Sequence, residues 1–370
     1  MPLHNARLNA ERPAGGMPPQ FASARARRIA LAASGWSGSL DQWFRMAPDP
    51  AKDRPCDPQS CWVLLGPTAV GKTEFSLRLA QRHPVEIVSV DSMQVYRGMD
   101  IGTAKPGPEQ LAQVPHHMID VVEPEESFSV GRYCAMAMEA ISGIQARGKR
   151  PLLVCGTPLY LKGLLWGLFE GPGADLALRQ RLRREAAEAG VPALHGRLAA
   201  VDPASAERID PNDFRRVERA LEVHELTGKP ISSLQDQFRG APRLAHVIVG
   251  LNRSRAQLYE RIDRRVDQMM AAGLPAEVRG LLGRLGLQAG QAVGYKEMAA
   301  HLRGELSLEE AVALIKRNSR RFAKHQLTWM RHFPGTVWLE LASGVPMTEA
   351  LRPCELLLMS LDRASGFGYD

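Results

Sequence analysis

The stretch Cys61-Trp62-Val63-Leu64-Leu65, followed directly by Gly66-Pro67-Thr68-Ala69-Val70-Gly71-Lys72-Thr73, decides the fold of this chain of 370 residues. Its first five residues are an apolar run typical of a buried strand, and its last eight match the pattern G-x-x-x-x-G-K-[ST]. A helical segment is predicted to follow from Thr73 to about Arg82. In such a unit, backbone N–H groups surround a phosphate, the lysine adds a positive charge and the Ser/Thr hydroxyl can reach Mg²⁺. We therefore expect a phosphate site, suited equally to a diphosphate or to ATP, at Gly66, Thr68, Ala69, Val70, Gly71, Lys72 and Thr73.

Apolar runs and helical segments alternate along the rest of the chain. Further runs that read as strands are Glu86–Val90, Met118–Val122, Leu152–Cys155 and His246–Leu251. Helical segments are predicted at Val130–Arg147, Ser254–Ala271, Pro275–Leu285 and Ser307–His332. This alternation predicts an α/β fold, a P-loop NTPase-like parallel sheet flanked by helices.

The chain divides into five parts by composition. Residues 1–60, rich in Pro, Ala, Ser and Arg, are expected to be a disordered extension, either a transit peptide or sequence upstream of a true start at Met46. The first part of the α/β core is expected at 61–174, and a charged, strand-free helical insertion domain at 175–239. Residues 240–345 should complete the core with C-terminal helices, and residues 346–370 should form a C-terminal tail.

Composition restricts the environment and the partners of the chain. No apolar run approaches the roughly 18 residues of a spanning helix, so no membrane association is expected. The five cysteines include no C-x-x-C pair, which argues against a zinc site and a disulfide framework and favours a reducing, cytoplasmic location. We expect a monomer. The net charge of +7 favours a polyanionic partner, and an acid-free stripe contains Lys316, Arg317, Arg320, Arg321, Lys324 and Arg331.

The ends of the predicted strands carry polar groups. Asp91 follows Glu86–Val90, at the end of what should be the strand next to the phosphate-loop strand, and Asp120 follows Met118-Ile119. Asp91 could bind metal or act as a general base, although it could also merely cap the next turn. The run Leu152–Cys155 ends in Gly156-Thr157 instead, and a hydroxyl there suits a donor to a bridging or leaving oxygen.

From about Val63 to Arg331 the sequence resembles the bacterial tRNA dimethylallyltransferases, also called tRNA isopentenyltransferases. The motifs that carry the resemblance are Gly66–Thr73, Asp91–Pro106, Pro115-His116-His117, Asp210–Asp213, Thr227–Pro230, Val293-Gly294-Tyr295 and Ala323–Trp329. The resemblance implies transfer of a dimethylallyl group from dimethylallyl diphosphate to the exocyclic N6 amine of the adenosine immediately 3′ of the anticodon in tRNA. It also implies Mg²⁺ and the release of pyrophosphate, so that the phosphate loop holds a prenyl diphosphate.

Position by position, the resemblance also implies roles for individual residues. Asp91 corresponds to the base for the amine proton, Thr157 to the donor to the bridging oxygen, and Thr73 with Asp91 to the metal site. Arg265 corresponds to a clamp on the diphosphate, although a charge-rich helix could equally leave it solvated. The implied tRNA-binding residues are Asp91, Ser92, Met93, Gln94, Arg179, Arg215, Arg216, Val217, Glu218, Arg219, Gln291, Ala292, Val293, Gly294, Tyr295 and Lys296.

Some positions depart from the family pattern or carry a structural expectation. Cys155 and Pro158 stand where glycine is usual or frequent, and His325 stands where arginine is common. The adjacent His116 and His117 lack a third ligand and are interpreted as structural. Because Ile315, Phe322 and Trp329 recur every seven residues, we expect them in the core.

Three other functions share part of this pattern. A prenyltransferase acting on free adenine nucleotides would need the phosphate loop, Asp91 and Thr157 but no helical insertion. A small-molecule P-loop kinase would need an adenine site and lid arginines, and a nucleotide-dependent switch would need a base-reading motif. The sequence shows no such motif for the last two.

Overall fold

The computed structural model describes residues 60–169, 171–235, 240–341 and 347–364. The extension predicted at 1–60 lies outside these ranges except for Ser60. The described residues form one sheet of the strands β1 Cys61–Leu65, β2 Val85–Val90, β3 His116–His117, β4 Arg150–Cys155, β5 His246–Asn252 and β6 Val337–Glu340. Its order is β3-β2-β4-β1-β5-β6, and all neighbours run parallel. The predicted α/β class with a parallel sheet is confirmed.

The helices fall into three groups along the chain. The first group is α3 Lys72–Ala80, α4 Pro108–Leu111, α5 Val130–Ala146 and α6 Pro158–Trp166. The second is α7 Leu176–Ala189, α8 Val191–Val201, α9 Pro203–Arg208, α10 Phe214–Thr227 and α11 Ile231–Leu234. The third is α12 Arg255–Ala271, α13 Leu274–Leu281, the 3₁₀ turn η1 Ala289–Gln291, α14 Tyr295–Leu302, α15 Leu308–Met330 and α16 Met347–Ala364.

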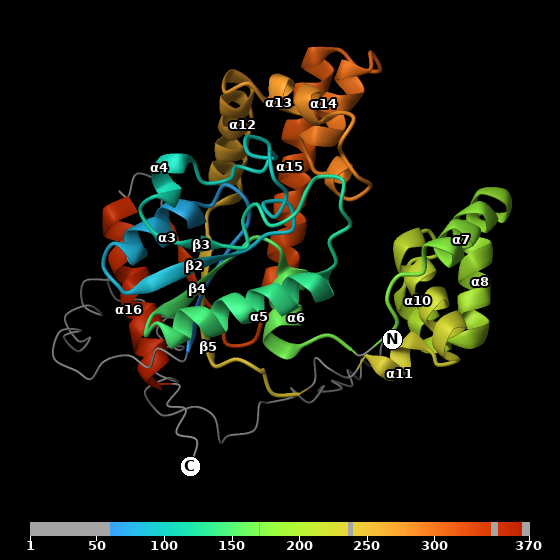
Figure 1. Cartoon of the computed structure of the whole chain (residues 1–370), viewed down its shortest axis with the longest axis horizontal. Helices are drawn as coiled ribbons and strands as arrows, with labels where there is room; N and C mark the ends of the chain where they lie inside the picture. The colour runs from blue at the N-terminus through green and yellow to red at the C-terminus, as the bar shows by residue number, and fades with distance from the viewer. Residues whose placement is uncertain (1–59, 170, 236–239, 342–346, 365–370) are drawn as a thin grey trace, which may run out of the picture.

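Side chains of β1 alternate between the two faces of the sheet. Cys61, Val63 and Leu65 join the hydrophobic cluster that contains residues of α5 and α6. Trp62 and Leu64 join the opposite cluster, where α3 and α16 cover the sheet (Figure 1). Because both faces are covered, every position of the strand is buried, and this explains its uninterrupted apolar sequence.

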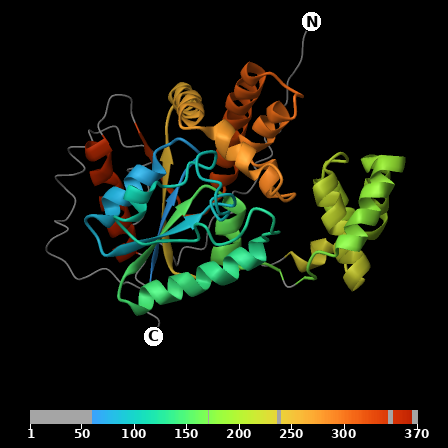
Figure 2. The same cartoon turned by 45° about the horizontal axis from the view of Figure 1, so that its top comes forward.

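Helices α7–α11 form a bundle that lies to one side of the sheet domain (Figures 1 and 2). Its hydrophobic cluster is built mainly from its own helices, around Leu182, Leu198, Val217 and Leu221. At the joint with the core, the backbone N–H of Arg243 donates to the carbonyl of Leu165 at 2.6 Å. Gly167 lies in this joint with a φ of 85°, a backbone conformation that favours glycine, and the guanidinium of Arg243 packs over it.

Several predicted elements differ from the structure. The strand expected at Met118–Val122 is wrong: β3 ends at His117, because Met118 and Asp120 have φ of 65° and 54° and interrupt the extended backbone. The sheet order also places β4 between β1 and β2, so the strand that precedes Asp91 is not the direct neighbour of β1. The edge strand β6 was not predicted, and α13 ends at Leu281 rather than Leu285.

Candidate active site

The phosphate loop has the backbone that its sequence pattern requires. Ala69 and Gly71 have φ of 62° and 119°, and a Cβ on Gly66 would lie 2.9 Å from the carbonyl oxygen of Leu251. The ammonium of Lys72 donates to the carbonyls of Gly66 at 2.7 Å and of Pro67 at 3.0 Å. Burial lowers the pKa of Lys72 to about 8, and the nearby Arg265 acts in the same direction.

Three arginines of the β5–α12 region surround this loop. Arg253 and Arg261 donate from Nε to the carbonyls of Val70 at 3.0 Å and of Ala69 at 2.8 Å, and so fix the outer side of the loop. Arg265 reaches Thr68 Oγ1 with Nη1 at 3.4 Å and lines the same cavity. Burial, followed by the charge of Arg261, lowers the pKa of Arg265. The solvated alternative for Arg265 is therefore wrong, because its guanidinium faces the phosphate loop.

Asp91 and Thr157 lie at the ends of adjacent strands. The register pairs Val90 with Cys155, so the residues that follow, Asp91 and Gly156, face each other. Asp91 Oδ1 accepts backbone N–H bonds from Met93 at 2.8 Å and Gln94 at 3.3 Å, which is the turn cap considered above. Its Oδ2 is directed at Gly156, where a Cβ would lie 2.9 Å away. One carboxylate oxygen thus holds the turn, while the other is left at the cavity edge.

The Thr157 hydroxyl is oriented by the turn that follows Asp91. Its Oγ1 accepts the backbone N–H of Ser92 at 3.0 Å and donates its proton to Ser92 Oγ at 3.4 Å. Thr157 precedes α6, but its side chain does not cap that helix. The proton of Thr157 is thus directed at Ser92 Oγ in a long hydrogen bond, which a better acceptor in the cavity could replace.

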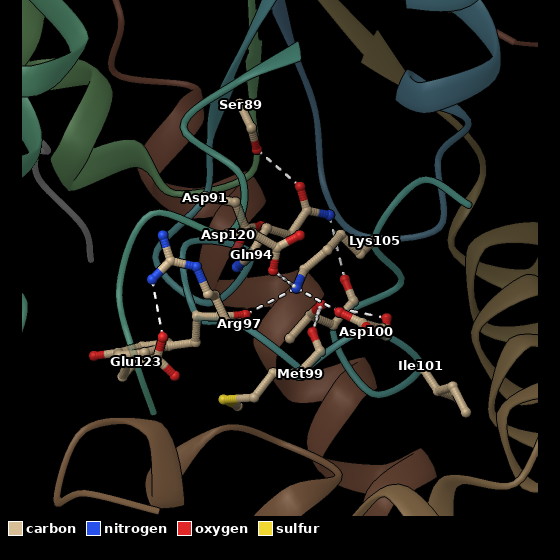
Figure 3. A network of polar contacts seen from close by, with 12 residues as sticks. Ser89, Asp91, Gln94, Arg97, Met99, Asp100, Ile101, Lys105, Asp120 and Glu123 are labelled. Carbon is tan, nitrogen blue, oxygen red and sulfur yellow. Dashed lines mark hydrogen bonds and ion pairs between the residues drawn. The ribbon is translucent and has the colours of Figure 1, made fainter. Parts of the chain in front are cut away.

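Figure 3 shows the polar network that shapes the loop after Asp91. Gln94 accepts from Ser89 Oγ at 2.8 Å and donates to the carbonyls of Thr103 and Ala104, both at 3.3 Å. The side chain of Lys105, only 3% exposed, contacts Asp100 and Asp120 at 2.6 Å each. Asp120 therefore helps to hold this loop together.

Glu277 anchors the same loop from the side of α13. Its carboxylate accepts backbone N–H bonds from Asp100, Ile101 and Gly102 at 2.7–3.1 Å, and it also accepts the hydroxyl proton of Tyr295. A Cβ on Gly102 would lie 2.4 Å from the Tyr295 ring. The segment Gln291–Lys296 is thereby packed directly onto the loop that lines the cavity.

The sequence reasoning missed the role of Gln326. This side chain of α15 is 4% exposed and bridges two parts of the site. Its Oε1 accepts the backbone N–H of Thr68 at 2.9 Å, and its Nε2 donates to the carbonyl of Gly156 at 2.6 Å. The amide thus fixes the distance between the phosphate loop and the turn that carries Thr157. A glutamine in a basic helix gave no sign of this task.

One cavity of about 310 Å³ is lined by residues of the phosphate loop together with Arg265, Asp91 and Thr157. Its lining also includes the apolar side chains of Met93, Val154, Ile262, Val266, Met269, Val293, Ile315 and Phe322. Such a cavity suits a ligand with a charged head and a short apolar tail.

The expected tRNA-binding residues lie in two surroundings. Gln291, Ala292, Val293 and Gly294 line the cavity, Tyr295 is buried, and Lys296 is exposed. In the insertion, Arg215 and Arg216 are exposed, whereas Val217 is buried and Glu218 pairs with Arg183 at 3.1 Å. Arg179 and Arg219 both bind the buried carboxylate of Glu222, at 2.8 and 2.6 Å.

Helix α15 differs from the expectation that its heptad apolar positions form core. Ile315 is buried at 1% exposure, but Phe322 and Trp329 are 45% and 41% exposed, so the expectation is wrong for those two. The basic stripe also divides into two sets. Lys316 and Arg320 pair with Asp267 and Asp263 of α12. In the part of the chain that the structure describes, the exposed Arg317, Arg321, Lys324 and Arg331 enter no ion pair.

The two histidines of β3 have protein partners. His116 Nδ1 lies 2.8 Å from the carbonyl of Val114, and His117 Nε2 lies 2.8 Å from Glu86. Among the described residues, no group of three or more His, Cys, Asp or Glu side chains is placed to hold a metal. These contacts agree with the structural interpretation of the pair.

Among the described residues, no helix combines the length and apolar character needed to cross a bilayer.

The fold and the site together describe a P-loop protein whose cavity combines the phosphate loop with apolar side chains, a carboxylate and a hydroxyl. Comparison with known proteins agrees with this class. Residues 59–122 match the family model described as Isopentenyl transferase, and residues 94–333 match the one described as IPP transferase. The chain belongs to the tRNA dimethylallyltransferase family and is an enzyme of this type.

Individual relatives cover most of the chain. The tRNA dimethylallyltransferase of Symbiobacterium thermophilum is 54% identical over 282 residues, which are 75% of this chain and 88% of that protein. The crystal structure of the full-length tRNA isopentenylpyrophosphate transferase from Bacillus halodurans has 41% identity and a TM-score of 0.63, covering 84% of this chain and 100% of that one. A eukaryotic dimethylallyltransferase acting on tRNA has 28% identity and a TM-score of 0.64, covering 76% and 74%.

Proposed function

We propose that this protein transfers the dimethylallyl group of dimethylallyl diphosphate to the N6 amine of the adenosine immediately 3′ of the anticodon in tRNA. The C1–O bond to the diphosphate breaks, the N6–C1 bond forms, the amine loses one proton and pyrophosphate leaves. The observation that carries the proposal is one cavity lined by the phosphate loop, by apolar side chains and by Asp91 and Thr157. The protein is inferred to act as a monomer in the cytoplasm, where tRNA is found.

The diphosphate head fits the phosphate loop together with Lys72 and Arg265. Backbone N–H groups of the loop and the two cationic side chains supply positive charge, and the planar guanidinium can donate two parallel hydrogen bonds to the phosphate oxygens. The five-carbon tail then lies along the apolar side chains of the cavity, where water is excluded.

Mg²⁺ fits the same cavity. The Thr73 hydroxyl and the Asp91 carboxylate line it, and Mg²⁺ is usually bound by one or two such oxygens together with substrate phosphates rather than by a full protein cage. When bound, the ion would neutralise charge that develops on the departing pyrophosphate.

Asp91 and Thr157 are proposed to perform the proton and charge steps. With Oδ1 fixed by two backbone N–H groups, Asp91 keeps Oδ2 at the cavity edge, where it can accept the proton that N6 loses. Thr157, which takes the N–H of Ser92 on its lone pair, can donate its proton to the bridging oxygen as negative charge grows there.

The tRNA is proposed to approach between the helical bundle and the core. Exposed Arg215 and Arg216 face solvent on the bundle, while Gln291, Ala292, Val293 and Gly294 line the cavity. An adenosine must leave its stack to enter the cavity, and phosphate contacts on both sides would stabilise the opened loop. The pairs of Arg179 and Arg219 with Glu222 orient those guanidinium groups.

A direct test uses radiolabelled dimethylallyl diphosphate and Mg²⁺ with either unmodified tRNA or AMP. Label should enter tRNA, and Asp91→Ala and Thr157→Ala should each remove it. Thr157→Ser should restore part of the rate, and Asp120→Asn serves as a matched carboxylate control because Asp120 binds Lys105 instead of lining the cavity. Label in AMP alone would favour the free-nucleotide prenyltransferase, whereas ATP hydrolysis or phosphoryl transfer without prenylation would refute the proposed reaction.

A further inference from the structure

A second hollow of about 540 Å³ lies beside the joint with the helical bundle, outside the catalytic cavity. Helices α6 and α15 form it with the residues that follow α15. Its floor is aromatic: the ring of Trp166 lies 6.0 Å from that of Phe333 and 5.8 Å from that of His246. At its rim, Trp329 exposes 41% of its surface.

The rim of this hollow is polar and cationic. Lys162, Thr328 and His332 line it beside Trp329. An apolar floor with an exposed indole above it suits a flat aromatic ring, and a lysine beside it suits a ligand attached to phosphates.

Helix α15 links the hollow to the catalytic cavity. Phe322 lines the catalytic cavity and Trp329 lines the hollow, seven residues later on nearly the same face of the helix. Seven residues correspond to a rise of about 10 Å. Since a stacked strand advances about 3.4 Å per nucleotide, one RNA strand that places a base in the catalytic cavity can reach the hollow within about three nucleotides.

We propose that this hollow is a subsite for a second, unpaired nucleobase of the anticodon loop, stacked on Trp329, while the target adenosine occupies the catalytic cavity. The proposal rests on the proposed tRNA reaction. The occupant is a base rather than an apolar peptide because Trp329 shares a face of α15 with Phe322 of the catalytic cavity, and because the charged side chain of Lys162 lines the hollow. Because stacking tolerates every base, the subsite would hold the anticodon loop in position more than it would select the sequence of that loop.

The test measures binding of a labelled anticodon stem-loop RNA to the full-length protein. Trp329→Ala should weaken binding by about 5- to 100-fold, as expected for loss of one stacked base, while Trp329→Phe should retain most of the affinity. Leu308→Ala, at the other end of α15 and also exposed, is the matched control and should bind as the wild type does. The thermal unfolding midpoint of each variant is compared with that of the wild type, so that a loss of affinity caused by misfolding is recognised.

A series of stem-loops with one abasic nucleotide each then identifies the base. At one loop position other than the target, the abasic change should weaken binding to the wild type but not to Trp329→Ala. If every abasic change weakens binding equally in both proteins, or if Trp329→Ala binds as the wild type does, the subsite is refuted. Prenyl transfer by the wild type to the same RNA is measured in parallel. If no transfer occurs, the result counts against the proposed reaction, whereas the binding comparison of wild type and Trp329→Ala tests the subsite alone.

Discussion

Replacing Gln326 by methionine should uncouple the phosphate loop from the turn that carries Thr157. Methionine has a similar length but offers neither the acceptor for the Thr68 N–H nor the donor to the Gly156 carbonyl. The carbonyl lies in a buried contact, and the N–H borders the cavity, where water can replace its partner. Leaving the Gly156 carbonyl unpaired should cost roughly 1–3 kcal/mol of the free energy of unfolding, measured in urea.

The same variant should bind inorganic pyrophosphate less tightly. Because the Thr68 N–H belongs to the phosphate loop, loss of its orientation removes about one charge-assisted hydrogen bond, which corresponds to a tenfold or larger rise in Kd, measured by calorimetry. Gln288→Met is the control: Gln288 also accepts two hydrogen bonds, from the Phe128 N–H at 2.7 Å and the Tyr96 hydroxyl at 3.3 Å, but outside the cavity. It should lose stability while keeping pyrophosphate affinity. If Gln326→Met keeps that affinity as well, the bridge does not shape the phosphate loop.

Three further measurements address other parts of the structure. Burial lowers the pKa of Lys72 to about 8, so the charged ammonium that attracts anions is lost as the pH rises through 8. In a binding titration, pyrophosphate affinity should therefore fall about fivefold from pH 8 to pH 9. Lys72→Arg, which stays charged, should flatten this pH dependence. Tyr295→Phe removes the hydroxyl donor to the Glu277 carboxylate and should lower stability by about 1–2 kcal/mol in urea unfolding, with a higher KM for tRNA. Glu222→Gln leaves two guanidinium groups with a neutral partner and should lower the free energy of unfolding by about 1–3 kcal/mol, seen as a lower thermal midpoint by circular dichroism.

The sequence predicted those parts of the fold that depend on local pattern. The run at β1, the glycines of the phosphate loop and the β4 run that ends before Thr157 each carry their signal within about ten residues. It failed at Met118–Val122, because an apolar run gives no sign that Met118 and Asp120 adopt left-handed backbone. It also missed β6, whose four residues become a strand only by pairing with β5.

The site was predicted less completely than the fold. Asp91 and Thr157 were found because strand ends of a parallel sheet meet at one edge, a rule that needs no tertiary detail. The choice between turn cap and catalytic group for Asp91 could not be made from sequence, and the structure explains why: its two oxygens have different surroundings. The anchoring by Glu277 was likewise invisible, since it joins residues some 175 positions apart.

Helix α15 shows most clearly why a periodic pattern cannot assign function by itself. Its heptad positions Ile315, Phe322 and Trp329 are chemically alike, yet the first is buried, the second walls the catalytic cavity and the third borders the second hollow. The three side chains differ because different parts of the fold pack against the turn of α15 that carries each of them. The hydrophobic face of a helix usually needs cover, so the two turns where α15 leaves aromatic side chains exposed mark the places where the protein offers surface to something else. Both of those turns lie within about 10 Å along one helix, which is why we infer a single RNA strand, rather than two separate ligands, as the partner that would occupy the mouth of the cavity and the hollow together.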